Sequence, residues 1–202
     1  MARKTKEEAY KTRLNILYTA LNLFFEKGYA RTSLDDIASA CGITRGAIYW
    51  HFKDKADLFL TLSQQIDEEA KINYNEILEN TESLEGLLHE IGNYLVQFEE
   101  NENYWKFYCL INYKIEWNEE LEPVLVQYRE ELRDLLRVLS QTLGRLKDDG
   151  GLRNNIDTDE IALATWAFIE GLLGMWFLDP GIFSLKQTGA KLIGDYLRQF
   201  SS

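Results

Sequence analysis

The chain has 202 residues, 46% hydrophobic and 27% charged, a balance that fits a folded globular protein and excludes a disordered one. No run of about 18 apolar residues is present, and no apolar stretch follows the basic N-terminus, so we expect neither a membrane span nor a secretory signal. Two cysteines and two histidines without a C-x-x-C motif exclude a disulfide framework, predict no metal or cofactor, and fit a reducing cytoplasm.

Helix signals recur along the chain and predict nine helices with no strand. The first four are expected at residues 5–27, 33–41, 45–52 and 54–79, opened in turn by Thr5, Ser33, Thr44 and Asp54. Gly28 and Gly42 end the first two, because glycine tolerates the left-handed backbone of a helix stop. The other five are expected at residues 83–98, 104–117, 118–148, 157–179 and 185–200.

Charge is distributed unevenly along the chain, although the net charge of -11 would by itself argue against a nucleic-acid partner. Residues 1–55 carry ten Lys/Arg and six Asp/Glu, a net of +4, whereas the remainder carries twelve Lys/Arg and twenty-seven Asp/Glu, a net of -15. A basic segment such as residues 1–55, here called the head, attracts phosphate, whereas the acidic remainder, here called the body, is repelled by it. This pattern favours a DNA-binding N-terminal segment.

Two short helices joined by a glycine-containing turn, over residues 33–52, have the size of a helix-turn-helix. Arg45 stands at the start of the second helix, where its planar guanidinium can bind a guanine through two hydrogen bonds. Polar groups along that helix and its exit are expected to bind phosphate, and Trp50 either stacks on the DNA backbone or packs on the fourth helix. The candidate DNA-binding residues are Ser33, Thr44, Arg45, Gly46, Tyr49, Trp50, His51, Lys53 and Lys55.

The segment from Thr32 to Leu58 reads T-S-L-D-D-I-A-S-A-C-G-I-T-R-G-A-I-Y-W-H-F-K-D-K-A-D-L and resembles the DNA-binding head of the TetR family of repressors. Two segments resemble the AcrR-like and TtgR-like branch, which represses multidrug efflux pumps. They are R-G-A-I-Y-W-H-F-K-D-K and the opening M-A-R-K-T-K-E-E-A. The resemblance implies a nine-helix fold, a homodimer, and release of DNA on ligand binding. Residues 113–116 depart from it, reading Tyr-Lys-Ile-Glu where that branch often carries His-Lys-Cys-Glu.

Aromatic residues of the body cluster in two segments, residues 104–117 and 166–177. We expect about half of them in the core, but a core prefers Leu, Ile and Val, and several Trp and Tyr beside acids suit a pocket for flat apolar or cationic molecules. The expected partner is a lipophilic small-molecule inducer. The predicted walls of the ligand pocket are Trp105, Tyr113, Trp117, Trp166 and Phe168, with Glu116 and Glu170 as counter-charges.

Small residues form a second stripe on the eighth predicted helix, at spacings of three, four and three, which allows another helix to approach closely. We prefer a two-fold four-helix dimer interface, formed with the ninth helix, over internal packing. The stripe consists of Ala164, Ala167, Gly171 and Gly174.

The sequence therefore predicts an all-α cytoplasmic repressor with a DNA-binding domain at residues 1–57 and a ligand-binding and dimerisation domain at residues 58–202. Its expected DNA partner is a double-stranded palindromic operator, to which it binds as a homodimer. No membrane partner is expected. Three alternatives stay open: a repressor of a metabolic operon that answers to a specific metabolite, an interaction module that uses DNA for docking, and a small-molecule enzyme. The enzyme alternative lacks a nucleophile–base set and a phosphate loop.

Overall fold

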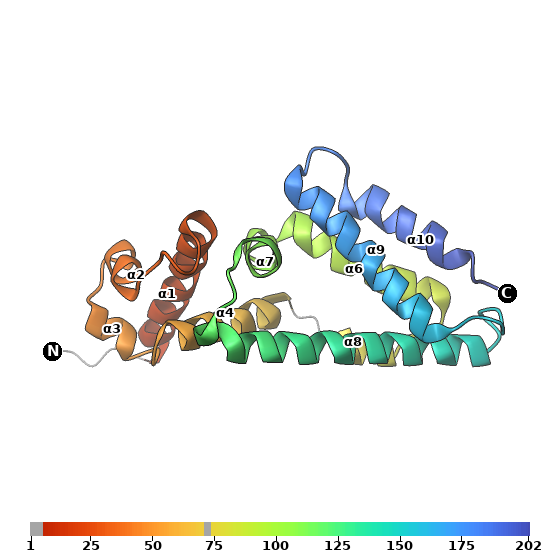
Figure 1. Cartoon of the computed structure of the whole chain (residues 1–202), viewed down its shortest axis with the longest axis horizontal. Helices are drawn as coiled ribbons and strands as arrows, with labels where there is room; N and C mark the ends of the chain where they lie inside the picture. Colours follow the sequence, from red (N-terminus) through yellow and green to blue (C-terminus); the bar gives the residue numbers. More distant parts are fainter. Residues whose placement is uncertain (1–5, 71–73) are drawn as a thin grey trace. The chain divides into compact units, whose positions relative to one another are not determined.

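A computed structural model describes residues 6–70 and 74–202, and the predicted all-α class is confirmed. The described residues form ten α-helices, two π-helical turns and one 3₁₀ turn, and their β-structure is an isolated bridge between Leu152 and Ser201. The chain divides into two compact units (Figure 1). The first unit comprises Met1–Lys71 with Glu102–Val126, and the second comprises Ile72–Asn101 with Gln127–Ser202.

The first unit is built around α1 (Lys6–Lys27), whose apolar residues recur every three or four positions and therefore share one buried face. Gly28 ends α1 as predicted, with φ of 87° and its N–H donating to the carbonyl oxygen of Phe24. Contacts with that helix come from α2 (Leu34–Cys41) and α4 (Lys55–Ala70), and α3 (Arg45–Tyr49) packs on α2. The shared core includes Leu17, Leu21, Phe24, Ile37, Ile48, Phe52, Phe59 and Leu62.

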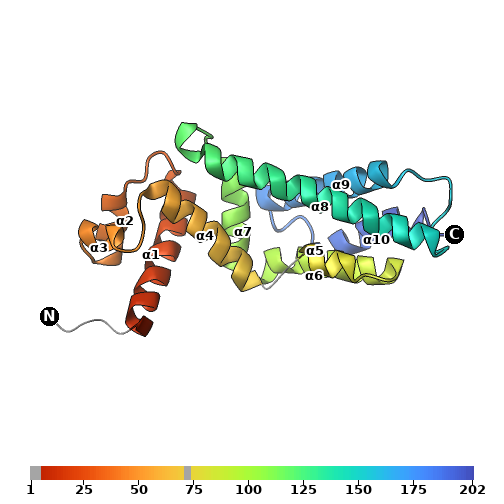
Figure 2. The same ribbon diagram turned by 90° about the horizontal axis from the view of Figure 1, so that it is seen from below.

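A later segment, α7 (Glu102–Cys109), completes the first unit by packing on α1 and α4 (Figure 2). The ring of Phe107 lies 5.6 Å from the ring of Phe59, and Lys106 Nζ donates to Asn22 Oδ1 at 2.9 Å. Because of these contacts, the compact unit does not end at residue 57. The functional boundary between residues 57 and 58 remains a prediction.

Two predicted helices differ in the structure, and a third has a start that the structure does not describe. The sixth was expected to reach Trp117, but α7 is followed by a π-helical turn, η1 (Leu110–Lys114), and Ile115 is extended. The N–H of Ile115 donates to the carbonyl oxygen of Leu110, which closes the turn and stops the helix. The fourth is described as α4 and α5 (Tyr74–Glu79), with 71–73 outside the described residues. The expected cap at Thr5 also lies outside the described residues.

The second unit contains α5, α6 (Leu84–Glu100), most of α8 (Glu122–Asp148), α9 (Thr158–Leu178), the π-helical turn η3 (Leu185–Gly189) and α10 (Ala190–Arg198). The 3₁₀ turn η2 (Glu119–Leu121) precedes α8 in the first unit. Polar contacts fix the helix ends: Glu99 accepts the N–H of Leu185 at 2.6 Å, and Arg145 donates to the carbonyl oxygens of Leu78 and Glu79. These contacts hold α6 to η3 and α8 to the end of α5.

Candidate nucleic-acid interface and ligand cavity

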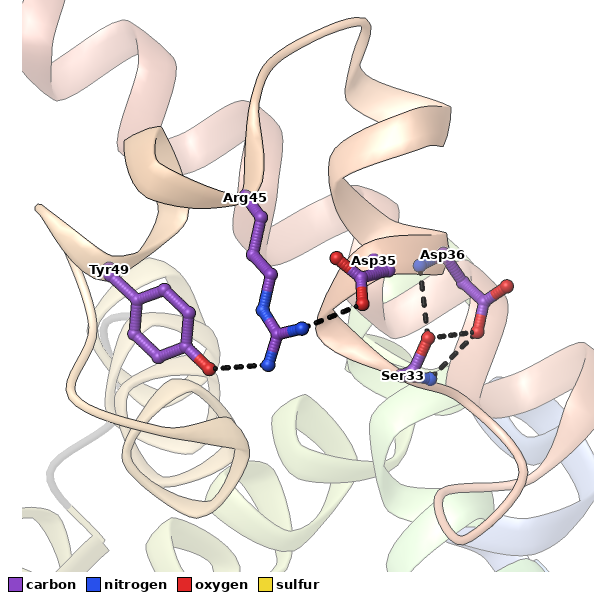
Figure 3. Close-up of polar contacts among 5 residues, drawn as sticks. All are labelled: Ser33, Asp35, Asp36, Arg45 and Tyr49. Atoms are coloured by element: carbon purple, nitrogen blue, oxygen red, sulfur yellow. Dashed lines mark hydrogen bonds and ion pairs between the residues drawn. The ribbon is translucent and has the colours of Figure 1, made fainter.

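The two short helices of the head have the capping geometry that their sequence predicts. Ser33 Oγ accepts the N–H of Asp36 while Asp36 accepts the N–H of Ser33, a reciprocal capping box at the start of α2 (Figure 3). Gly42 ends α2 with φ of 66°, and Thr44 Oγ accepts the N–H of Ala47 at the start of α3. The first turn of α3 is therefore fixed in position.

Arg45 lies at this first turn, with its guanidinium held at the surface between α2 and α3. One terminal nitrogen donates to Asp35 Oδ2 at 2.9 Å and the other to the hydroxyl oxygen of Tyr49 at 3.0 Å (Figure 3). The hydrogen bond to Tyr49 and the charge of Asp35 raise the pKa of Arg45. Both side chains of the Arg45–Asp35 pair are more than half exposed, so water already competes for them and a base edge can replace Asp35 at small cost.

The two lysines at the exit of the head have different surroundings. Lys53 is exposed, and its backbone N–H donates to Asp57 Oδ2 at 2.8 Å. The Lys55 side chain is 16% exposed, and its Nζ donates to the carbonyl oxygen of Tyr29 at 3.2 Å, above the Tyr29 ring. Its Nζ also lies 4.0 Å from a carboxylate oxygen of Glu120. Lys53 is the better placed of the two for phosphate.

The remaining predicted DNA-binding residues lie at the surface around α3. Gly46 and Tyr49 are exposed, His51 is half-buried, and Trp50 is 74% exposed with its ring 4.6 Å from that of His51. Of the two interpretations of Trp50, its exposure favours stacking on DNA over packing on α4. Ser33 and Thr44, at the caps of α2 and α3, are exposed as well.

Four of the predicted ligand-binding residues belong to the first unit. Trp105 packs edge-on against Phe25 with ring centroids 5.3 Å apart, which gives it a place in the α1–α7 contact. The other three, Tyr113, Glu116 and Trp117, are exposed in and after η1. None of these four residues is among those that line the cavity described next.

A cavity of about 410 Å³ lies within the second unit, between α5, α6, α8 and α9. Its lining is mostly apolar, which is typical of a site for an apolar small molecule. Trp166 is the predicted wall residue that lines it, and its ring lies 5.7 Å from that of Tyr94. Phe168 instead contacts Tyr196 on α10, and the half-buried Glu170 is not among the lining residues, which are Ile77, Leu78, Glu90, Ile91, Asn93, Tyr94, Val96, Gln97, Glu100, Leu135, Leu139, Trp166 and Ile169.

α6 also carries a polar stripe that was not predicted from the sequence, which we define as Glu90, Asn93, Gln97 and Glu100. These residues follow one another at spacings of three, four and three, so they share one side of the helix, and all four line the cavity. Asn93 Nδ2 donates to Glu90 Oε2 at 3.3 Å, and Lys186 pairs with Glu100 at 3.0 Å. The detectable signal was this run of polar residues directly beside the apolar face of α6.

An exposed apolar stripe runs along α9. Leu163 is 60% exposed, Met175 54% and Leu178 85%, and Leu192 on α10 is 39% exposed. Three of the predicted small residues, Ala164, Ala167 and Gly171, are exposed beside them, whereas Gly174 is half-buried. A Cβ added at Gly171 would meet nothing within 4 Å. Contiguous exposed apolar side chains are typical of surfaces that bind a partner.

Neither a metal cluster nor firm evidence of a membrane span emerges from the described residues. Across 6–70 and 74–202, no group of three or more His, Cys, Asp or Glu side chains is placed to hold a metal ion. α9 is long and apolar enough to cross a membrane by length and composition alone. A single helix of this kind is weak evidence, because core helices of soluble proteins pass the same test, and α9 buries six of its residues in the second unit.

Comparisons with known proteins match an N-terminal and a C-terminal region of the chain. Residues 16–62 match the family described as bacterial regulatory proteins, tetR family, and residues 84–202 match the C-terminal region of MAATS-type transcriptional repressors. The HTH-type transcriptional regulator AcrR of Shigella flexneri is 34% identical over 206 residues, covering 99% of this chain and 94% of that protein.

Two solved structures extend the comparison to three dimensions. NalD, the secondary repressor of the MexAB-OprM multidrug efflux pump in Pseudomonas aeruginosa, has a TM-score of 0.82 at 28% identity and covers 96% of this chain and 97% of its own. The SmeT–triclosan complex, SmeT being the repressor of the SmeDEF multidrug efflux pump of Stenotrophomonas maltophilia, has a TM-score of 0.78 at 27% identity and covers 95% and 92%.

Proposed function

Because the chain belongs to the TetR family of bacterial regulatory proteins, we propose that it is a ligand-responsive repressor of a multidrug efflux operon. It binds a palindromic operator as a homodimer in the cytoplasm and leaves the DNA when a lipophilic small molecule binds. One observation carries the proposal: a single chain combines an exposed, capped helix-turn-helix with a separate apolar cavity of about 410 Å³. Its output is occupancy of DNA, and we assign it no catalytic step.

The DNA-binding part of the proposal rests on α3 and its surroundings. Arg45 reads a base in the major groove, and the hydroxyl, imidazole and ammonium groups around it bind phosphate, with Lys53 in the most accessible position. Symmetry of a dimer requires a palindromic operator whose half-sites are about 34–36 Å apart or a multiple of that distance.

The dimer part rests on the exposed stripe of α9. Ala164, Ala167 and Gly171 leave room for a second helix, while Leu163, Met175 and Leu178 supply apolar area to bury. Pairing α9 and α10 with the same helices of a second copy covers this surface. Gly174 is half-buried, so we assign it a secondary place in the interface.

The ligand part rests on the cavity and on α8, which begins in the first unit and lines the cavity in the second. α8 contributes Leu135 and Leu139 to the cavity and Val124 to the buried part of the first unit. A ligand that favours one position of α8 over another shifts the protein between DNA-binding and released states only by its difference in affinity for the two. Tenfold weaker DNA binding requires about 1.4 kcal/mol of such coupling.

A binding assay with the DNA that flanks the gene tests the proposal. We expect the full-length protein to shift a palindrome from this DNA, and triclosan, the ligand of the SmeT complex, to release it. A random duplex of equal length serves as the control for specific binding. Failure to bind any flanking DNA contradicts the repressor assignment. Binding that answers to a polar metabolite, and to no lipophilic compound, contradicts the assignment of the cavity and supports a metabolic repressor.

A further inference from the structure

The carboxylate and amide side chains that line the cavity all come from the polar stripe of α6. α5, α8 and α9 contribute Ile77, Leu78, Leu135, Leu139, Trp166 and Ile169. A ligand without any polar group leaves the polar stripe facing apolar surface, which is unfavourable. The arrangement fits a molecule that is apolar over most of its surface and carries one polar or charged group.

The sign of the charge on this wall is negative. The lining residues include Glu90 and Glu100, and none of the described lining residues is Lys, Arg or His. Glu100 is exposed and already paired with Lys186, so part of its charge is neutralised. Glu90 is half-buried, its hydrogen bond comes from the neutral amide of Asn93, and no Lys or Arg of the described chain forms an ion pair with it.

Aromatic rings adjoin this carboxylate and suit the same kind of ligand. Tyr94 follows Glu90 by one helical turn on α6, so the two side chains share a side of the helix, and Trp166 lies against Tyr94 from α9. Ring faces attract cations, most strongly where water is partly excluded. A positive group beside Glu90 therefore gains from the carboxylate and from the rings together.

We propose that Glu90 makes the cavity selective for lipophilic monocations, whose charge lies at the polar stripe and whose apolar part lies against Leu135, Leu139 and Trp166. This rests on the proposed function, because it names the chemical class of the ligand for the same cavity. Quaternary ammonium and phosphonium compounds with aromatic substituents belong to this class. Lipophilic anions are excluded by the same carboxylate.

Three probes with the same phenyl groups and different charge test the proposal: tetraphenylphosphonium, triphenylphosphine oxide and tetraphenylborate. Calorimetric titration of the full-length protein is expected to give the tightest binding for the cation, by about tenfold over the neutral probe, as for an ion pair in a half-buried site. In Glu90→Gln we expect the cation to fall to within about twofold of the neutral probe. Glu90→Lys should reverse the order in favour of tetraphenylborate.

Glu82→Gln is the matched control, because it removes the same charge from the exposed turn before α6, outside the cavity. Far-UV circular dichroism and melting of each variant report whether it folds. Equal loss in Glu82→Gln and Glu90→Gln, or equal binding of the three probes to the natural protein, overturns the selectivity while leaving the cavity as a ligand site. Binding of none of the probes, together with failure of triclosan to release operator DNA, overturns the ligand part of the proposed function as well.

Discussion

Replacing Lys55 by Met should destabilise the head without changing how its DNA binding depends on salt. Lys55 Nζ donates to the carbonyl oxygen of Tyr29 at 3.2 Å and lies 4.1 Å from the centre of the Tyr29 ring. A hydrogen bond from a charged donor contributes about 1.5–3 kcal/mol and a partly buried cation–π contact about 1 kcal/mol. The 4.0 Å pair with Glu120 adds little, because Glu120 is 44% exposed.

Methionine keeps most of the apolar stem of lysine and recovers part of this energy, so we expect a net loss of about 2–3 kcal/mol in the free energy of unfolding. For a chain of this size, that corresponds to a melting temperature lower by about 5–10 °C. Denaturant unfolding and thermal melting followed by circular dichroism measure the effect.

Lys53→Met is the matched comparison, two residues away and exposed. It should leave the melting temperature unchanged and lower the slope of log affinity against log salt by about one for each head, because a phosphate contact is lost. Fluorescence anisotropy on one operator duplex at several salt concentrations gives these slopes. A Lys55→Met variant that melts like the natural protein and has a lower salt slope would contradict this structural role, since Lys55 would then leave Tyr29 for a phosphate.

Four further predictions address the other parts of the molecule. Arg45→Ala should relax sequence preference at one position of each half-site in a binding competition, and equal losses on operator and random DNA would contradict base readout. Gly171→Trp should give a folded monomer with weak operator binding, because its Cβ faces open space; a normal dimer by sedimentation would refute the interface. Trp166→Ala should weaken triclosan binding about tenfold by calorimetry, and unchanged binding would place the ligand elsewhere. Hydrogen bonds from Ser33 lower the pKa of the Asp36 carboxyl, so the stabilisation they give is present at neutral pH and is lost as the pH falls below about 4. The difference in melting temperature between the natural protein and Ser33→Ala should therefore shrink below that pH. A difference that stays constant with pH would falsify the linkage.

Local signals in the sequence predicted most of the fold. The caps at Ser33 and Thr44, the helix starts at residues 83 and 157, and the stop at Gly42 are confirmed, because a helix end is decided by residues within one helical turn. The end of the sixth predicted helix was wrong because aromatic content says little about where a helix stops. The π-helical closure at Ile115 depends on backbone geometry rather than on a residue type that marks it.

The cavity was harder to predict than the helices. Aromatic richness indicated a site but did not separate Trp166, which lines it, from Trp105, which packs on Phe25. The choice between them depends on which helices meet across tens of residues of sequence. The same limit applies to Lys55. Its positive charge suits phosphate, but its ammonium lies over the Tyr29 ring and donates to the Tyr29 carbonyl oxygen. Chemical type is local information, whereas the neighbour of a side chain is not.

The placement of α7 in the first unit has a consequence for synthesis and for engineering. During translation, α1 to α4 leave the ribosome well before Lys106 and Phe107, so Asn22 and Phe59 lack these partners until α7 has emerged. A head transplanted as one contiguous N-terminal fragment would expose the same surface permanently. Designers of hybrid regulators should therefore move two pieces of this chain, the N-terminal helices and residues 102–126, as one exchangeable part.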